Sequence, residues 1–439
     1  MEAVDATTDA IGAGPRTAAG PAPAPPPRRL PAGVYLLGFS LFAMGTAEFL
    51  MAGVLPEAAD DLGVSLSSAG FLITAFALGV VVGGPPFAVL SLRWPRRTAL
   101  VVTQGVFALA VAAGLLGDYR VLLVTRVVAG LAYAGFFAVA SVTAIGLVPP
   151  ERTARASGVV VSGLSMAMVA GGPAGTLLGH VTEWRGGFWG VVALTGAGIA
   201  GCLLGLPRHG GSGRSAAPSL ARELSAMRRP ALWGVYAITI LTTAAYMITF
   251  NYLAALLTEV TALPRVWVPA VLALFGAGAF AGLAVGGRIS DRRPHLALLT
   301  GASAVVLLSA LMAVALHRVW AAVPVVLLLG IAAFVLNPAV YARVFAIAAD
   351  APALAGATTV SAFQLGISLT PVLAASALAR GAALTAVCLI GAALAAAAVP
   401  LILLDRARQA RAVRTAEGED RPPHAGAAGA AGARKAPQS

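Results

Sequence analysis

The sequence predicts an all-α membrane protein with twelve transmembrane helices in two halves of six. Three observations lead to this prediction. The 439 residues are 59% hydrophobic and only 11% charged, whereas a soluble protein is about one quarter charged. The apolar residues come in runs of roughly 20, the length of a helix that crosses a bilayer. The longest polar break in the apolar region, residues 207–230, leaves six runs on each side.

We expect each apolar run to span the membrane. The first half contains the runs 33–55, 70–92, 98–117, 121–147, 157–180 and 188–206. The second half contains the runs 232–257, 266–288, 296–316, 321–347, 354–379 and 382–404. Two compositionally biased segments, 1–32 and 405–439, are predicted to be disordered tails. Between them lie an N-terminal half (33–206), a central loop (207–230) and a C-terminal half (231–404).

The basic residues define an orientation. The formal net charge of +12 could suggest a nucleic-acid partner, but the Arg residues cluster at the ends of apolar runs and in the tails. Loops on one side, for example around Arg152 and Arg228, hold most of the Arg in the short loops, and such loops face the cytoplasm. Both termini are therefore expected in the cytoplasm. The preference for Ala, Gly and Arg over Lys suggests a bacterial source, and hence a bacterial cell membrane.

A faint internal repeat relates the two halves. Val161-Ser162-Gly163 in the first half recurs as Val360-Ser361-Ala362 in the second, an offset of 199 residues. Arg93 and Arg292, each after the second span of its half, share this offset. Parallel halves of this kind are an architecture of secondary transporters, which bind substrate near the membrane midplane.

A lone carboxylate lies within the first apolar run, in the segment Gly45-Thr46-Ala47-Glu48-Phe49. An ionised Glu in hydrocarbon costs several kcal/mol by most estimates. Burial favours the neutral form, so Glu48 is expected to gain and lose a proton near neutral pH. The alternative is a structural role without titration, in which Glu48 pairs with Arg126 across the bundle.

The loop after the eighth span carries a recognisable pattern of Gly, acid and base in Gly287, Asp291 and Arg292. This pattern resembles the loop signature of the major facilitator superfamily. The equivalent first-half loop keeps Arg93 and Arg96 but has Leu at position 92, where the superfamily has an acid. The resemblance implies that these charges latch one conformation. The alternative is that they only end a helix and follow the positive-inside rule.

Two further motifs resemble the same superfamily. Arg126 in the fourth span resembles an Arg that is linked there to proton coupling, although it could also reach water at the end of its span. The fifth span carries a Gly-Pro cluster that resembles a motif of drug:proton antiporters, with Pro to bend the helix and Gly for close packing. The cluster consists of Gly171, Gly172, Pro173 and Gly175.

The stretch from Gly45 to Arg97 is similar to the chloramphenicol efflux proteins of actinomycetes, which belong to the twelve-span drug:proton antiporter family. It contains Leu55-Pro56 and Leu90-Ser91-Leu92-Arg93-Trp94-Pro95. The superfamily resemblance covers residues 33–404, and the closer similarity is strongest in the first half. It implies proton-coupled export of small amphiphilic drugs, with phenicol antibiotics as the expected substrate. Sugars, nucleosides or an endogenous antibiotic remain alternative substrates.

Polar and aromatic residues in the second half are candidates for the substrate cavity, because amides and phenols can hydrogen-bond a neutral drug and aromatic rings can stack on it. The alternative for each is a hydrogen bond between helices. Arg343 lies near the predicted inner end of its span, where it can snorkel to water. With Glu48, the candidates are Tyr246, Asn251, Asn337, Phe363 and Gln364.

Other function classes are disfavoured. The sequence contains no hydrolase triad, no metal-ligand spacing and no phosphate-binding loop, so we expect neither an enzyme nor a bound cofactor or metal. A channel would rely on oligomeric pore repeats, whereas this chain has two halves in line and is expected to act as a monomer. The expected partners are a drug, protons and the lipid bilayer.

Overall fold

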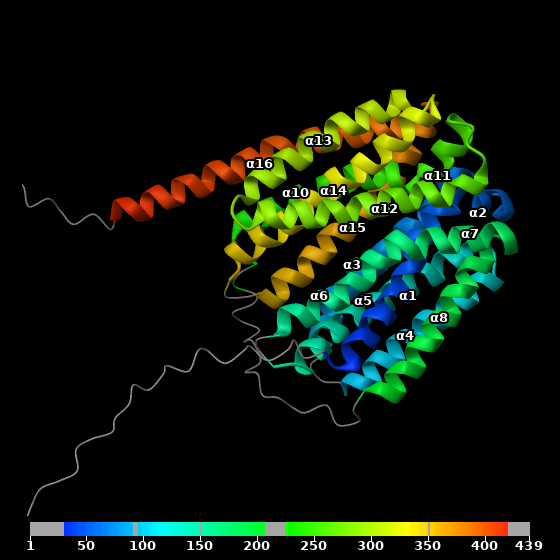
Figure 1. Cartoon of the computed structure of the whole chain (residues 1–439), viewed down its shortest axis with the longest axis horizontal. Coiled ribbons are helices and arrows are strands. Elements are labelled where there is room, and N and C mark those ends of the chain that lie inside the picture. Colours follow the sequence, from blue (N-terminus) through cyan, green and yellow to red (C-terminus); the bar gives the residue numbers. More distant parts are fainter. Residues whose placement is uncertain are drawn as a thin grey trace, which may run out of the picture. The chain divides into compact units, whose positions relative to one another are not determined.

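The computed structural model describes residues 30–90, 95–149, 152–206, 225, 227–349 and 352–419, and these residues contain helices and no strands. Twelve helical segments are long and apolar enough to cross a membrane, which confirms the predicted all-α membrane fold (Figure 1). Almost all of the N-terminal tail and of the central loop lies outside the described residues, as does Arg93.

The first half forms six spans and a short helix that follows the first of them. The fifth span is divided by a π-helical turn, η2, just before Pro173. The elements are α1 (Ala32–Gly53), α2 (Leu55–Leu62), α3 (Leu66–Leu90), α4 (Arg96–Leu116), α5 (Tyr119–Gly146), α6 (Thr153–Met166), η2 (Ala167–Gly171), α7 (Gly172–Thr182) and α8 (Trp184–Gly205).

The second half repeats this plan with six spans. Short elements follow its first span and lead into its second. The elements are α10 (Pro230–Asn251), α11 (Leu253–Ala255), η3 (Leu256–Val260), η4 (Arg265–Trp267), α12 (Val268–Ser290), α13 (Pro294–Ala315), α14 (Val319–Ile347), α15 (Pro352–Leu378) and α16 (Ala386–Glu419).

Local sequence explains where several helices begin and end. Asp118 caps α5, because its carboxylate accepts the backbone N–H of Val121 at 2.9 Å. Pro230 and Pro294 occupy the first turns of α10 and α13, where a missing N–H costs no hydrogen bond. Gly63 ends α2 at a φ of 63°, a backbone region that Gly adopts without strain.

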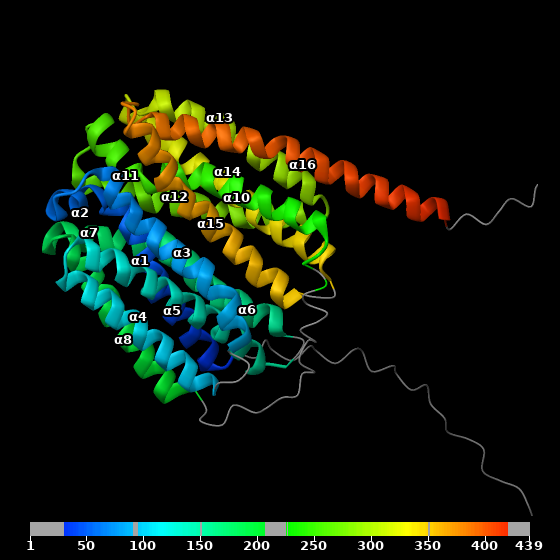
Figure 2. The same cartoon turned by 180° about the vertical axis from the view of Figure 1, so that it is seen from behind.

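The two halves pack along α3 and α15, which lie side by side in both views (Figures 1 and 2). The Thr74 hydroxyl on α3 donates to the carbonyl of Ser368 on α15 at 2.9 Å. Helix α12 of the second half also packs against η2 and α7 of the first half. Glu48 on α1 and the candidate residues on α10, α14 and α15 therefore belong to helices that meet where the halves join.

The two ends of the bundle differ in how the first helix of each half is buried. We define the basic end as the one with Arg96, Arg97, Arg292 and Arg293, and the opposite end as the one with α2 and α11. Toward the opposite end, residues 43–56 and 242–257 are all buried. Toward the basic end, the same two helices have partly exposed residues. The halves are therefore in close contact at the opposite end.

Two expectations about the C-terminal part are wrong. Residues 405–419 of the predicted disordered tail continue α16 as a helix to Glu419, because their Ala, Arg and Glu residues are good helix formers. The rest of that tail, 420–439, lies outside the described residues. Arg343 does not snorkel. It is 5% exposed and forms two hydrogen bonds to Asp405, Nε to Oδ2 at 2.9 Å and a terminal nitrogen to Oδ1 at 3.0 Å. The His295 ring contacts the same carboxylate at 2.8 Å.

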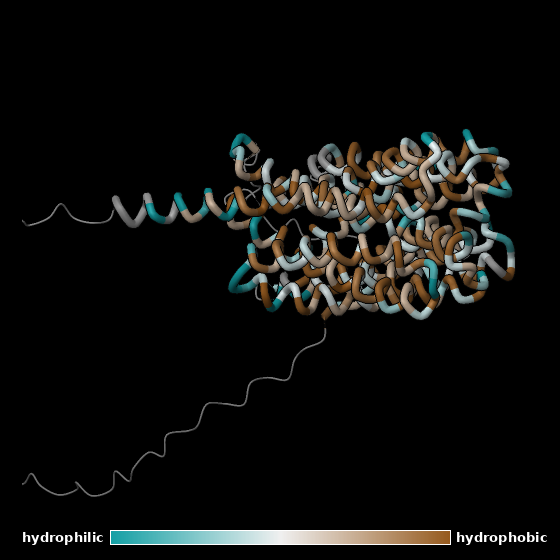
Figure 3. Tube along the Cα trace, turned by 90° about the horizontal axis from the view of Figure 1, so that it is seen from above, coloured by the Kyte–Doolittle hydropathy of each residue, from teal (hydrophilic) through white to brown (hydrophobic). Residues whose placement is uncertain are grey.

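Hydropathy along the chain agrees with a membrane-spanning bundle. The helices are mainly hydrophobic along their length, whereas the hydrophilic segments gather at the two ends and on the projecting end of α16 (Figure 3). Leu109, Leu307 and Val314 are large apolar side chains that are more than two-thirds exposed on the spans. Such an exposed apolar surface is expected where lipid covers the protein.

Candidate functional site

Glu48 lies in the part of α1 that is buried on every side. Its neighbours Ala47 and Leu50 are fully buried, while Glu48 retains 9% of its exposure. The Arg126 guanidinium on α5 and the Gln364 amide on α15 interact with its carboxyl group. The carboxyl group is thus within electrostatic reach of both halves, which the sequence could not establish.

Arg126 is held by backbone carbonyls and not by an ion pair with Glu48. Its Nε donates to the carbonyl of Leu72, and a terminal nitrogen donates to the carbonyl of Ala47, each at 3.2 Å. At 4% exposure, it does not reach water at the end of its span. Among the ion pairs of the described residues, none joins Arg126 and Glu48.

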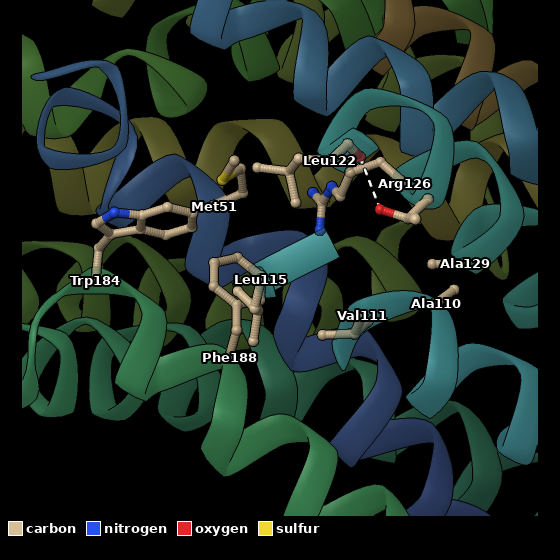
Figure 4. Close-up of a pocket in the computed structure, with 10 residues that line it drawn as sticks. Met51, Ala110, Val111, Leu115, Leu122, Arg126, Ala129, Trp184 and Phe188 are labelled. Carbon is tan, nitrogen blue, oxygen red and sulfur yellow. Dashed lines mark hydrogen bonds between the residues drawn. The ribbon is translucent and has the colours of Figure 1, made fainter. Parts of the chain in front are cut away.

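Aromatic rings complete the surroundings of Arg126. The guanidinium carbon lies 5.0 Å from the ring centre of Phe76 and 5.7 Å from that of Phe188, a geometry that favours a cation. In Figure 4 the Arg126 side chain enters a small pocket that Leu115 and Phe188 also line. The charge is thus stabilised by carbonyl dipoles and π-systems, and it remains close to Glu48.

The predicted second-half residues divide into two groups. Asn251 is 4% exposed, and its amide donates to the Thr370 hydroxyl at 2.8 Å, so it joins α10 to α15. Tyr246 is 2% exposed and interacts with Asn337 and, electrostatically, with Glu48. Gln364 contacts Glu48 itself. Tyr246, Asn337 and Gln364 therefore share one polar cluster with Glu48, and Asn251 has a structural partner instead.

Two carbonyl oxygens of this cluster have no hydrogen-bond partner. They are Asn337 Oδ1 and Gln364 Oε1, and both atoms are buried. A buried acceptor without a donor costs about 1–3 kcal/mol. Both oxygens can therefore accept a hydrogen bond from a donor group that reaches the cluster.

Aromatic residues border the cluster. Phe363 packs against Tyr341 with ring centres 5.8 Å apart, and Tyr341 in turn interacts electrostatically with Tyr246 of the cluster. The ring of Phe49, next to Glu48, meets the ring of Phe250 edge-on, with ring centres 6.3 Å apart. The ring centres of Phe250 and Phe275 are 4.7 Å apart. These rings offer stacking surfaces beside the polar groups.

Tyr133 on α5 was missed in the sequence. It is 2% exposed, packs against Phe76 with ring centres 5.6 Å apart, and interacts electrostatically with Glu48. A signal was available, because Tyr133 follows Arg126 by seven residues. Two turns of helix place these residues on the same face.

The Gly-Pro cluster packs directly on the part of α1 that carries Glu48. A β-carbon at Gly171 would overlap the Thr46 hydroxyl, one at Gly172 would lie 3.0 Å from Phe49 Cβ, and one at Gly175 would lie 3.0 Å from Leu50 Cδ1. Pro173 follows the π-helical turn. These residues therefore fix the position of α1 around Glu48.

The predicted latch residues make fewer contacts. Asp291 and Arg292 are exposed after α12, and no ion pair joins either to another described residue. A β-carbon at Gly287 would meet no atom within 4 Å. Arg96 lies beside Gly146 at the end of α5. The described residues thus contain no latch through Asp291, and they contain no cluster of three metal-ligating side chains.

Comparisons with known proteins agree with this geometry. Residues 37–371 match the sequence model of the Major Facilitator Superfamily. The chain is 39% identical to a chloramphenicol resistance protein of Streptomyces lividans over 80% of this chain and 90% of that protein. It is 31% identical to the inner membrane transport protein YdhP of Escherichia coli K12, over 86% of this chain and 96% of that protein.

A solved structure of a mutant of the nucleoside transporter NupG shares the fold. The TM-score is 0.68 at 13% identity, with 85% of this chain and 99% of that chain covered. The sequence match and the shared fold identify the same kind of protein. The chain belongs to the Major Facilitator Superfamily, and it is a multi-pass membrane transporter.

Proposed function

We propose that this chain is a proton-coupled exporter of small amphiphilic drugs, and that chloramphenicol-type antibiotics are among its substrates. The observation that carries the proposal is Glu48, a buried carboxyl group that interacts with Arg126 of its own half and Gln364 of the other. The Streptomyces lividans relative, a chloramphenicol resistance protein, supports the substrate class.

The basic end is cytoplasmic in this proposal, and the membrane is the bacterial cell membrane. Arg96, Arg97, Arg292 and Arg293 at that end follow the positive-inside rule. Both termini then lie in the cytoplasm. Since the two halves of one chain form the cluster around Glu48, a monomer is sufficient for transport.

The transport cycle uses two charge states of Glu48. The drug enters from the cytoplasm or the inner leaflet while Glu48 is ionised, and it lies against Tyr246, Asn337 and Phe363. The halves then rock to open the opposite end. The drug leaves, a proton binds Glu48, and the return of the protonated carrier resets the cycle. Exchange of a neutral drug for one proton moves one charge inward, worth about 2.3 kcal/mol per 100 mV.

Drug accumulation in cells tests the role of Glu48. We expect Glu48→Gln to abolish export of labelled chloramphenicol under a pH gradient, because the amide cannot carry the proton. Glu183→Gln is the matched control, since it makes the same chemical change at an exposed site between α7 and α8 and should export normally. Export by Glu48→Gln at the wild-type rate, with both proteins in the membrane, would refute this mechanism.

A resistance panel tests the substrate. Expression in a sensitive host should protect against phenicols. Protection against other drugs only, or export of sugars or nucleosides without any phenicol phenotype, would replace the substrate proposed here. The panel thus separates the proposed substrate from the alternatives of the same family.

A further inference from the structure

Gln364 occupies a distinctive position on α15. Its side chain is 6% exposed and interacts with the Glu48 carboxyl group, while its Oε1 atom is buried without a partner. An ionised carboxylate only accepts hydrogen bonds, and a primary amide has one donor group and one acceptor group. With Glu48 ionised, the Gln364 NH₂ group must face Glu48, and Oε1 is left as a free acceptor.

Protonation of Glu48 reverses this arrangement. A protonated carboxyl group has an O–H donor that needs an acceptor. The terminal torsion of Gln is broad and roughly two-fold, so the amide can exchange its oxygen and nitrogen by a half-turn. Oε1 then accepts the Glu48 O–H, and the NH₂ group takes the position that Oε1 held.

We propose that Gln364 is a positioning residue that converts the charge of Glu48 into ligand affinity. With Glu48 ionised, Gln364 presents an acceptor and binds a neutral ligand through a hydroxyl or amide N–H group. With Glu48 protonated, Gln364 presents a donor and rejects the same group. This inference rests on the proposed function, and it specifies the substrate class as neutral molecules that donate hydrogen bonds.

Asn337 provides a second acceptor for such a ligand. Its Oδ1 atom is also buried without a partner, and its side chain interacts with Tyr246. The amide of Asn337 has no carboxyl partner among the interactions of the described residues, so Glu48 protonation does not require it to turn. The ligand therefore keeps its hydrogen bond to Asn337 and loses the one to Gln364, which lowers its affinity and favours release.

The other groups around Glu48 do not change charge in the relevant range. They are Arg126 and Tyr133 on α5, Tyr246 on α10 and Gln364 on α15, with Tyr341 on α14 interacting with the two Tyr residues. Guanidinium and phenol groups ordinarily keep one protonation state between pH 5 and 8. Arg126 also has its Nε and one terminal nitrogen committed to carbonyls. Glu48 is therefore the group whose proton turns Gln364.

Binding measured across pH tests the inference. The full-length protein in lipid nanodiscs is titrated with labelled chloramphenicol, a neutral ligand with hydroxyl and amide donors, between pH 5.5 and 8. For the wild type we expect the Kd to rise about tenfold at acid pH, the effect of one lost hydrogen bond that leaves a buried group unpaired. Gln364→Met, similar in length and without polar atoms, should show less than about a twofold change.

Gln104 provides a matched control. It is also a buried Gln with an unpaired Oε1. It lies on α4, where its amide nitrogen donates to the Leu100 carbonyl at 3.1 Å and contacts the Cys202 sulfur at 3.5 Å. Gln104→Met should keep the pH dependence of the wild type. Glu48→Gln cannot change charge at this position, so it should bind chloramphenicol with a Kd that does not depend on pH.

A chemical change in the ligand tests the donor requirement. Methylation of the chloramphenicol hydroxyl groups should weaken binding at pH 8 and flatten the pH dependence of the wild type. The inference would be overturned if the Kd of Gln364→Met depended on pH as strongly as that of the wild type. It would also be overturned if the wild type showed the same pH dependence with the methylated ligand. In either case, export of chloramphenicol by the wild type would leave the proposed function intact. If the wild type neither binds nor exports chloramphenicol, the proposed function fails and this inference with it.

Discussion

Arg343 and Asp405 form a buried ion pair in the second half. Asp405 accepts two hydrogen bonds from Arg343 and contacts His295, so one carboxylate joins α13, α14 and α16. Asp405→Asn removes the negative charge and leaves Arg343 buried and unpaired. We expect a loss of about 3–5 kcal/mol in stability, measured by thermal unfolding of the purified protein in detergent.

Replacement of both partners is the informative comparison for this pair. Arg343→Met together with Asp405→Leu should recover most of the lost stability, because no uncompensated charge remains. Arg406→Ala, one residue further along α16 and exposed, should unfold like the wild type. A double variant that is less stable than Asp405→Asn would show that shape and not charge dominates here.

Charged residues inside apolar runs could be identified from the sequence, because a charge in lipid costs free energy. Their interaction partners could not be identified in this way. Glu48 and Arg126 stand out because each is a charge inside an apolar run. The contact of Glu48 with Gln364 joins residues on α1 and α15, and no local pattern encodes such a distance along the chain. The composition around Asp405 predicts a tail, and no pattern near Arg343 indicates that Asp405 is its partner.

Pairs of glycines bring helices into contact at equivalent positions in the two halves. A β-carbon at Gly79 or Gly130 would overlap a backbone carbonyl of the facing helix in the α3–α5 pair. Gly278 and Gly330 have the same relation in the α12–α14 pair. The positions differ by 199 and 200 residues, which agrees with the offset of the sequence repeat. The repeat therefore preserves backbone contacts as well as spans.

These contacts predict a strong effect of a single methyl group. Gly130→Ala should destabilise the protein by about 1–3 kcal/mol, because the added carbon meets the Phe76 carbonyl and must separate α3 from α5. The measurement is thermal unfolding in detergent. Gly105→Ala on α4 is the control, since no atom lies within 4 Å of its β-carbon and Ala favours a helix. Equal unfolding temperatures for the two variants would contradict this account.

The spans could be predicted from the sequence and their irregularities could not. The run predicted over 98–117 corresponds to α4 at Arg96–Leu116, and the run over 321–347 to α14 at Val319–Ile347. Hydrophobic length determines these boundaries. The π-helical turn η2 lies just before Pro173, which has no N–H to donate to a carbonyl four residues earlier. Proline thus predicts a bend here, whereas the packing of Gly171 against Thr46 joins residues more than a hundred positions apart.

At the scale of the whole molecule, the opposite end carries an open pocket of about 740 Å³ between the short elements of the two halves. Asp60 of the first half and Glu259 and Arg265 of the second half line it. Burial first, and then the negative charge of Asp60, raise the pKa of Glu259 above its ordinary value. The ionised form of Glu259 is therefore less favoured in this closed arrangement than in an ordinary exposed Glu.

The raised pKa of Glu259 determines how pH shifts the equilibrium between the closed and the open opposite end. When the opposite end opens, Asp60 and Glu259 separate and the pKa of Glu259 returns toward its ordinary value. The ionised form then favours the open end at higher pH, and the closed end gains stability as pH falls through the raised pKa. Both groups are largely exposed, so solvent screening limits the change in the equilibrium between these states to about fivefold or less.

Variants at this cavity test the effect. Glu259→Gln should favour the closed end at every pH and remove its pH dependence, because the amide resembles the protonated acid. Arg265→Gln removes a positive charge beside the two acids and should shift the equilibrium the other way. Fluorophores on α2 and on the loop before η4 report the separation of the halves by energy transfer. An unchanged response to pH in Glu259→Gln would mean that another group at this end carries the titration.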